Sequence, residues 1–277
     1  MPELPEVETI VRGLTADVQD KIIADVLIKR KDLRQKMPDN LAEILINKQI
    51  TRIKRRAKYL LFDLNESHSL IVHLGMSGKM ILKKKDPSWQ KNLNKHDHIA
   101  ILLNDNNYLV FNDPRRFGLV DIVETDKIND CKLLSVLGIE PLTKEFDTLY
   151  LYNLTRGFKT PIKQFLMDGH KVVGIGNIYA SESLFMAKID PRRTATSLDQ
   201  EESDKLVTSI KEVLLAAIKA GGSSLKDYRN AADEAGYFQH NFAVYSRANQ
   251  NCKNCSNKIS EIRQAGRATY FCPNCQK

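Results

Sequence analysis

The sequence contains no long apolar run. None of its 277 residues belongs to a stretch that is long and apolar enough to span a bilayer, and no apolar segment near the N-terminus resembles a signal peptide. Internal repeats and low-complexity tracts are missing as well. These absences argue against a membrane protein, a secreted protein and a repeat architecture, and they predict a cytoplasmic location.

Cysteine is scarce, with five residues in the whole chain. In a reducing compartment such cysteines are metal ligands or free thiols more often than disulfides. Four of them form two pairs with the spacing Cys252-x2-Cys255-x16-Cys272-x2-Cys275. This spacing predicts one tetrahedral zinc ion in a structural site, because four thiolates leave no open coordination position. The fifth, Cys131, lies alone and is expected to be an ordinary thiol.

Charge is unbalanced towards the basic side. Lysine and arginine exceed aspartate and glutamate to give a formal net charge of +8, which suggests an anionic partner. The last 28 residues hold five of the cations and a single anion. A basic balance alone is weak evidence, since many proteins that bind no polyanion are also basic.

The order of the apolar patterns predicts two parts with different architecture. A helix over 5–18 precedes a strand over 21–29, a short helix near 41–45 and seven short strands with turns between them. These strands are expected at 50–53, 59–64, 69–74, 79–82, 98–103, 108–111 and 119–123, and they are typical of an antiparallel sandwich. From residue 149 the pattern becomes helical, with helices predicted over 149–157, 161–167, 177–186 and 199–220.

The first eight residues, Met-Pro-Glu-Leu-Pro-Glu-Val-Glu, allow two interpretations. Removal of Met1 would leave Pro2 with a free amine, which is less basic than a lysine side chain and can attack carbon to form an iminium. Glu3 and Glu6 could then move the protons that this chemistry requires. The alternative is an ordinary helix start, with proline and acidic residues in the first turn.

Four further segments have the composition of nucleic-acid contacts. A glycine turn opens a helix in Gly174-Ile-Gly-Asn-Ile-Tyr-Ala, and a hairpin over 264–271 presents Arg267. Two loops, His73-Leu-Gly-Met-Ser-Gly and Asn112-Asp-Pro-Arg-Arg-Phe-Gly, place Met76 and Phe117 at exposed tips. Apolar wedges of this kind fill the gap that a flipped base leaves in a duplex, whereas the ordinary alternative is packing in a core.

The N-terminal string Pro-Glu-Leu-Pro-Glu-Val-Glu resembles that of the bacterial formamidopyrimidine-DNA glycosylases, which remove 8-oxoguanine from DNA. The glycine turn followed by Ser181-Glu-Ser-Leu-Phe is similar to the helix–two-turn–helix element of that family, and the resemblance extends over essentially the whole chain. It implies an α+β multidomain protein. The expected parts are an antiparallel β-sandwich with flanking helices at 1–135, a linker at 136–148, a helical helix–two-turn–helix domain at 149–240 and a β-hairpin zinc finger, or zinc ribbon, at 241–277.

The resemblance also implies roles for individual residues. Pro2 would be the nucleophile of a bifunctional glycosylase and abasic-site lyase, Glu3 its acid and base, and Glu6 a support for the N-terminal geometry. Lys58 and Arg267 would act at the lesion on phosphate. The remaining DNA contacts that the family pattern implies are His96, Met76, Arg115, Arg116, Phe117, Lys163 and Asn177. The Lys95-His-Asp-His cluster has metal-like spacing but no third ligand, so we interpret His98 as structural.

The sequence departs from the family pattern at two places. Ile139 replaces a frequent proline, and Ser246 stands where glycine is usual. The expected partner is double-stranded DNA with oxidised bases or abasic sites, bound by a monomer in the cytoplasm or at the nucleoid. Two rival functions remain: an endonuclease VIII-like glycosylase for oxidised pyrimidines, and a non-catalytic zinc-ribbon DNA-binding protein.

Overall fold

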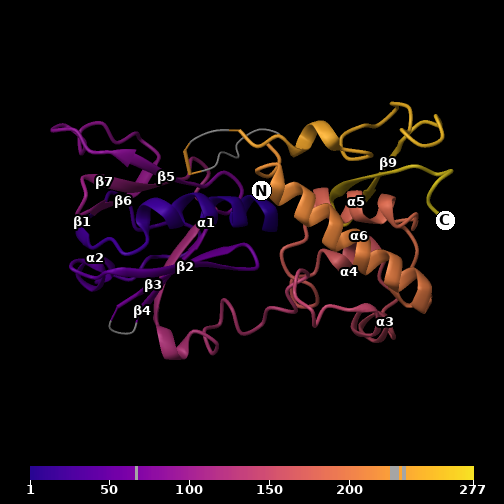
Figure 1. Ribbon diagram of the computed structural model, residues 1–277, viewed down its shortest axis with the longest axis horizontal. Coiled ribbons are helices and arrows are strands. Elements are labelled where there is room, and N and C mark those ends of the chain that lie inside the picture. Colours follow the sequence, from indigo (N-terminus) through magenta and orange to yellow (C-terminus); the bar gives the residue numbers. More distant parts are fainter. Residues whose placement is uncertain (66–67, 225–230, 233–234) are drawn as a thin grey trace. The chain divides into compact units, whose positions relative to one another are not determined.

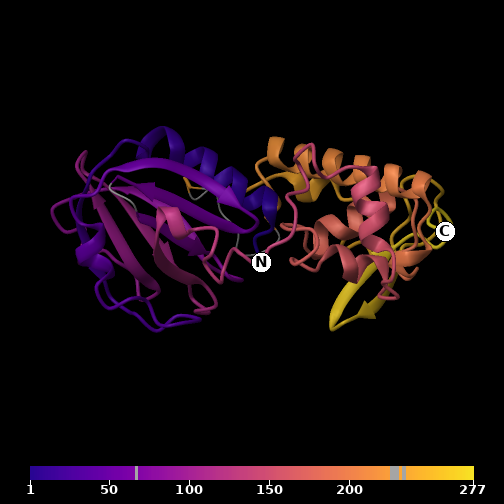
Figure 2. The same ribbon diagram turned by 90° about the horizontal axis from the view of Figure 1, so that it is seen from below.

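The computed structural model describes residues 1–65, 68–224, 231–232 and 235–277 (Figures 1 and 2). The chain forms two compact units. The first comprises Met1–Ser135 and Gly221–Tyr237, and the second comprises Val136–Ala220 and Phe238–Lys277. The predicted domain at 149–240 differs from this division, because Gly221–Tyr237 packs with the first unit. For example, the N–H of Leu82, in the segment Met1–Ser135, donates to the carbonyl of Ala231 at 3.1 Å.

Two four-stranded antiparallel sheets build the first unit and confirm the predicted sandwich. One sheet has the order β1-β6-β7-β5, formed by Ile23–Ile28, Asp97–Leu103, Asn107–Asn112 and Lys79–Lys84. The other has the order β2-β3-β4-β8, formed by Ile50–Arg56, Tyr59–Leu64, His68–His73 and Leu119–Glu124. Apolar side chains from both sheets share one core. The short helix α2, Leu41–Leu45, packs on β1, and a 3-10 turn, Thr125–Lys127, follows β8.

Helix α1, Leu4–Val18, begins at the sequence signal that predicts it. Glu3 is the N-cap residue and Pro5 lies in the first turn, where its missing N–H costs no hydrogen bond. The apolar residues at helical spacing are all buried in the core of the sandwich: Val7, Ile10, Val11, Leu14 and Val18. The helix contacts β2 and β3, so the N-terminal residues that precede it are held against the sandwich.

Helices dominate the second unit: α3, Thr148–Thr155; α4, Ile162–Leu166; α5, Asn177–Met186; and α6, Gln200–Lys219. A reciprocal capping box between Asp199 and Glu202 starts α6. Gly221 and Gly222, at φ 75° and 78°, follow its end, as the C-cap pattern predicts. Two 3-10 turns, Ala195–Ser197 and Phe238–Asn241, precede and follow α6.

The chain ends in an antiparallel hairpin of β9, Ser260–Gln264, and β10, Arg267–Phe271, which projects from the helices of this unit (Figure 2). Ala265 and Gly266 form its two-residue turn, with φ of 45° and 77°. Positive φ at both positions is the geometry that matches the twist of a hairpin. None of the helices in the described part of the chain combines the length and apolar character that crossing a membrane requires.

Candidate active site and DNA interface

The residues around the start of α1 form a buried polar cluster. Pro2 is buried, and Glu3 and Glu6 are 3% and 2% exposed. Glu6 Oε2 accepts a hydrogen bond of 2.8 Å from the N–H of Glu3. Its other oxygen, Oε1, accepts from the N–H of Ser223 at 2.8 Å and from the Ser223 hydroxyl at 3.0 Å. Glu6 therefore ties the backbone next to Pro2 to the segment that follows α6.

Ser223 is a site residue that sequence reasoning missed. It lies 217 positions from Glu6, and no local pattern links the two. The family resemblance implies that residues 226–239, just beyond Ser223, cover the flipped base, and residues 226–230 and 233–234 of that segment lie outside the described residues.

Lys58 lies in the tight turn between β2 and β3, where Arg56 pairs with Tyr59 and Ala57 has φ 54°. The neighbouring cations Arg55 and Arg56 end β2 and directly precede the apolar strand β3. Arg55 is held by Glu8 of α1 at 2.9 Å. Lys58 is partly buried, and its charge acts on His73 at the end of β4.

His73 is kept neutral by its surroundings. Burial, together with the charges of Lys58 and Arg34, lowers the pKa of His73 to about 4. The N–H of Gly75 donates to His73 Nδ1 at 3.0 Å, so the proton of the neutral ring is on Nε2. The ring also lies 4.8 Å from that of Tyr59. Sequence reasoning missed this residue because a histidine at a strand end carries no distinguishing pattern.

Acidification should destabilise the fold through His73. The unfolded chain takes up this proton near the ordinary histidine pKa of 6.5, whereas the folded protein does so only near 4. The contribution of His73 to the free energy of unfolding is therefore fully present above about pH 6.5 and is lost as the pH falls towards 4. The free energy of unfolding should fall by about 2 kcal/mol between pH 7 and 5. Urea unfolding at both pH values should show a smaller loss for His73→Asn than for the wild type. His170→Asn, at an exposed position, should leave the difference unchanged, and equal losses in all three proteins would contradict the argument.

The two loop tips are exposed as expected. Met76 is 39% exposed and Phe117 is 46% exposed. The guanidinium of Arg115 lies 4.9 Å from the centre of the Phe117 ring, which gives that ring a fixed neighbour. Arg116, at φ 58°, forms an exposed ion pair of 3.1 Å with Asp32. Such a pair is weak, so a phosphate could replace the carboxylate.

The histidines near β6 behave as the structural interpretation expects. His98 is buried, and its Nε2 lies 2.7 Å from the carbonyl oxygen of Asp113. Within the described residues, the paired cysteines are the only set of three or more potential ligands that could hold a metal ion. His96 is partly buried, and its contact with DNA stays a prediction.

Lys163 of α4 joins α5 to the terminal hairpin. It is 1% exposed and donates to Asn177 Oδ1 at 2.6 Å, to Thr269 Oγ1 at 2.7 Å and to the carbonyl of Ala268 at 2.9 Å. Asn177 Nδ2 donates to the same carbonyl at 3.0 Å. Direct DNA contact by Lys163 stays a prediction, and its observed contacts are those of a residue that fixes Asn177 against β10.

A tyrosine close to Asn177 was not among the predicted site residues. The hydroxyl of Tyr245 lies 3.4 Å from Asn177 Nδ2, and its ring lies 5.2 Å from that of Tyr270. The backbone N–H groups of Ala243, Val244 and Tyr245 all donate to the buried carboxylate of Glu182 on α5, at 2.7 to 3.0 Å. The helix that starts at Asn177 therefore also positions Tyr245.

Arg267 is exposed at the start of β10, directly after the hairpin turn. It lines a pocket of about 310 Å³ together with Lys163 and Lys171. Asp168 lines the same pocket and pairs with Lys171 at 2.5 Å, so the exposed guanidinium of Arg267 is the group that an anion such as phosphate would meet there. The prediction that the hairpin presents Arg267 to solvent is thus confirmed, whereas its role on DNA remains to be tested.

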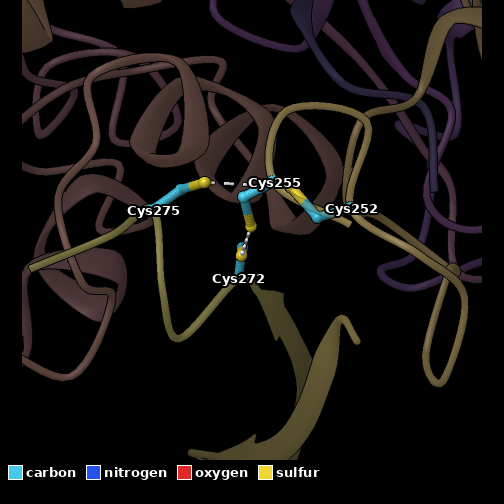
Figure 3. Close-up of side chains that lie close together, drawn as sticks. All are labelled: Cys252, Cys255, Cys272 and Cys275. Atoms are coloured by element: carbon cyan, nitrogen blue, oxygen red, sulfur yellow. Dashed lines mark hydrogen bonds between the residues drawn. The ribbon is translucent and has the colours of Figure 1, made fainter. Parts of the chain in front are cut away.

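The four paired cysteines converge on one point (Figure 3). Their sulfur atoms all lie within 4.8 Å of one another, with 3.9 Å between Cys252 and Cys275 and 3.4 Å between Cys255 and Cys272. Thiolates about 2.3 Å from a shared zinc ion would lie about 3.8 Å apart. The cysteines are positioned to bind one zinc ion, with no place left for a substrate, so the site is structural. Cys131 lies in the other unit.

The two departures from the family pattern have different local consequences. The N–H of Ile139 donates to the carbonyl of Lys171 at 3.2 Å, a bond that proline could not form. Ser246 has φ 58°, a region that favours glycine, so the serine is held there at some cost in strain. The Glu182 carboxylate holds the backbone of residues 243–245, directly before Ser246, and this keeps the strained turn in place.

Known proteins match this chain over its full length. Three family models cover it: the formamidopyrimidine-DNA glycosylase N-terminal domain at 1–120, the formamidopyrimidine-DNA glycosylase H2TH domain at 137–229, and the zinc finger found in FPG and IleRS at 249–277. A formamidopyrimidine-DNA glycosylase of Wolbachia pipientis wMel is 48% identical over 276 residues, with 100% of both chains covered.

Solved structures of the same family share the fold. A mutant of the Lactococcus lactis FPG in complex with a Fapy-dG containing DNA superposes with a TM-score of 0.91 at 35% identity, and 100% of each chain is covered. The Lactococcus lactis Fpg in complex with an abasic site containing DNA gives a TM-score of 0.90 at 35% identity, with 99% of each chain covered. Sequence models, a full-length relative and the fold agree, and the chain belongs to the formamidopyrimidine-DNA glycosylase family.

Proposed function

We propose that this protein is a base-excision repair glycosylase that removes oxidised purines, namely 8-oxoguanine and formamidopyrimidines, from duplex DNA and then cleaves the abasic site. The observation that carries the proposal is the buried cluster at the N-terminus, where Pro2 is followed by two buried carboxylates and Glu6 ties the backbone of Glu3 to Ser223. The neighbouring structures with Fapy-dG and abasic DNA support the same substrates.

The chemistry starts with the removal of Met1, whose 53% exposure leaves it open to an aminopeptidase. The lone pair of the Pro2 nitrogen then attacks C1′ of the flipped nucleotide, the C1′–N bond breaks, and the base leaves with a proton. Glu3 takes and returns protons while the sugar ring opens to an iminium. β-Elimination breaks the C3′–O bond and δ-elimination breaks the C5′–O bond, and water releases the sugar fragment from the amine.

The remaining predicted residues would hold the DNA. Lys58, Arg116 and Arg267 offer cations for phosphates, and the start of α5 at Asn177 offers N–H groups. Met76, Phe117 and Arg115 would occupy the gap left by the extruded base, with Arg115 facing the unpaired cytosine. The bacterial relatives support a bacterial cytoplasmic protein, and we propose that it acts as a monomer and associates with the nucleoid when bound to DNA.

A panel of lesions tests this function. Single-turnover excision should be at least about tenfold faster for 8-oxoguanine and formamidopyrimidine than for an oxidised pyrimidine in the same duplex, with the opposite base varied. The reverse order would favour an endonuclease VIII-like glycosylase. Binding without excision or borohydride trapping on any duplex would favour a non-catalytic zinc-ribbon protein.

A salt titration tests the proposed phosphate contact of Arg267. The logarithm of the binding constant should fall with the logarithm of salt by about 0.9 per phosphate neutralised, so Arg267→Ala should flatten the slope by about one unit. Arg263→Ala is the matched control, because Arg263 is also exposed but pairs with Ala268 and so lies on the other face of the hairpin. An unchanged slope for Arg267→Ala would show that this arginine does not contact the backbone.

A further inference from the structure

A buried carboxylate joins the two loops with exposed tips. Asp113 is fully buried, and Ser77 of the other loop is 5% exposed. The Ser77 hydroxyl donates to Asp113 Oδ1 at 2.6 Å, and the N–H of Gly118 donates to Asp113 Oδ2 at 2.7 Å. The N–H of Arg115 lies 3.2 Å from Ser77 Oγ and 3.3 Å from Asp113 Oδ1. One carboxylate therefore fixes its own loop and the neighbouring loop together.

The backbones of these loops also touch. Gly75 has φ 62°, and a Cβ atom there would lie 2.4 Å from the carbonyl carbon of Phe117 and 2.5 Å from the nitrogen of Gly118. A Cβ atom on Gly118 would lie 2.6 Å from Cζ of Phe111 and 3.0 Å from Asp113 Oδ2. A side chain at Gly75 would force the loops apart, and one at Gly118 would displace the Asp113 carboxylate that joins them. The close approach of the loops is therefore a fixed part of the fold.

Asp113 is in turn anchored to the rigid sheet. Its N–H donates to the carbonyl of His96 at 3.0 Å, and its own carbonyl accepts from His98 Nε2 at 2.7 Å. The carboxylate is thus held at the base of the loops, while Met76 and Phe117 extend into solvent at their tips. Leaving a buried carboxylate oxygen without its donor is costly, which favours the joined arrangement.

We propose that Asp113 and Ser77 are positioning residues that join the two loops into one preformed wedge, so that Met76 and Phe117 enter the duplex as a unit. This inference rests on the proposed function, because the wedge acts in base extrusion. Side chains that are already ordered lose less freedom on insertion than side chains on two independent loops. The joined loops therefore lower the cost of extruding an intact base, and they matter less where the base is already missing.

Ser77→Ala removes both hydrogen bonds that the Ser77 hydroxyl makes to the other loop, and it keeps both wedge side chains. We expect it to slow single-turnover excision of 8-oxoguanine about tenfold and to leave cleavage of a pre-formed abasic site within about twofold. Fluorescence of 2-aminopurine placed beside the lesion should show slower unstacking. Ser69→Ala is the matched control, because the buried Ser69 hydroxyl also donates to an aspartate, Asp63, at 2.8 Å, in the other sheet. It should leave all three measurements at wild-type values.

Two further variants separate this inference from the proposed function: Phe117→Ala, and the double variant that combines Phe117→Ala with Ser77→Ala. Wild-type excision by Phe117→Ala would refute the wedge itself. Slow excision by Phe117→Ala but normal excision by Ser77→Ala would overturn the coupling between loops, as would equal slowing by Ser77→Ala on both substrates. The double variant should be no more than about twofold slower than the slower single variant, and fully multiplicative losses would also overturn the coupling. If Ser77→Ala fails to fold, Ser77→Cys takes its place, because a thiol is a weaker donor than a hydroxyl. Partly slowed excision by Ser77→Cys would support the coupling between the loops, and unchanged excision would overturn it.

Discussion

A chain that keeps Met1 is expected to bind damaged DNA but to excise no base from it. The peptide bond to Met1 turns the Pro2 nitrogen into an amide without a nucleophilic lone pair, so excision of 8-oxoguanine and borohydride trapping should both fall at least about a thousandfold. DNA affinity should stay within about twofold of the processed protein, because the loop tips, the α5 start and the zinc hairpin are unchanged. Electrophoretic mobility shifts and trapping on one duplex measure the two properties together.

The same chain provides its own control. Protein produced while methionine aminopeptidase is inhibited keeps Met1, and later treatment with purified aminopeptidase should restore trapping in proportion to the Met1 removed. Pro2→Gly keeps a free amine without the ring that directs it, so trapping should weaken but persist. Glu3→Gln should bind DNA yet lose base excision, since an amide cannot exchange the proton. Mass spectrometry of the trapped, digested complex that located the DNA remnant on Lys58 or Lys163 would refute the Pro2 mechanism.

Cys272→Ser should abolish tight DNA binding while the sandwich stays folded. The three remaining thiolates bind zinc much more weakly, and in small zinc domains the metal contributes about 10–16 kcal/mol of folding energy. The hairpin supplies Thr269 and the Ala268 carbonyl to Lys163, so its loss should also release Asn177. We expect the zinc content to fall from one ion per chain to near zero and the affinity to fall at least about a hundredfold.

Metal analysis of the wild-type protein and a control variant of the unpaired cysteine, Cys131→Ser, complete this test. Cys131→Ser alters a thiol in the other unit and should retain both the zinc ion and the affinity. Circular dichroism should show that the strands of the first unit persist in Cys272→Ser. Wild-type protein that is purified without chelator and contains no zinc, yet binds DNA tightly, would contradict the structural role of the metal.

The features that the sequence predicted well are local in the chain. The cysteine spacing predicts the zinc site because a short turn brings the two members of each pair together, and the helix predicted over 199–220 differs from α6 by one residue at each end. Strand alternation located the sandwich, although β2 extends to Arg56, three residues beyond the predicted end. In each case neighbouring residues carry the whole signal, so no knowledge of the tertiary fold is needed.

The features that the sequence did not predict depend on contacts between distant residues. Glu6 and Ser223 lie 217 positions apart, and Lys163 meets Thr269 across 106 positions. The family resemblance implied a DNA contact for Lys163, whereas its burial against Asn177 and the terminal hairpin comes from how α4, α5 and β10 pack. Similarly, the motif around Arg115 identifies the exposed tip but not the Ser77 hydroxyl that holds it.

The path of the chain limits how this protein can be divided. The first compact unit is discontinuous, since it takes in both Met1–Ser135 and Gly221–Tyr237. A fragment that ended at Ser135 would lose the Ser223 donors of Glu6 and the Ala231 carbonyl that pairs with Leu82. The segment Met1–Ser135 is therefore not a transferable module on its own. An exchange of this unit with a relative would have to transfer both of its chain segments. The helices between the two segments are then constrained, because the chain must leave the first unit after Ser135 and re-enter it at Gly221.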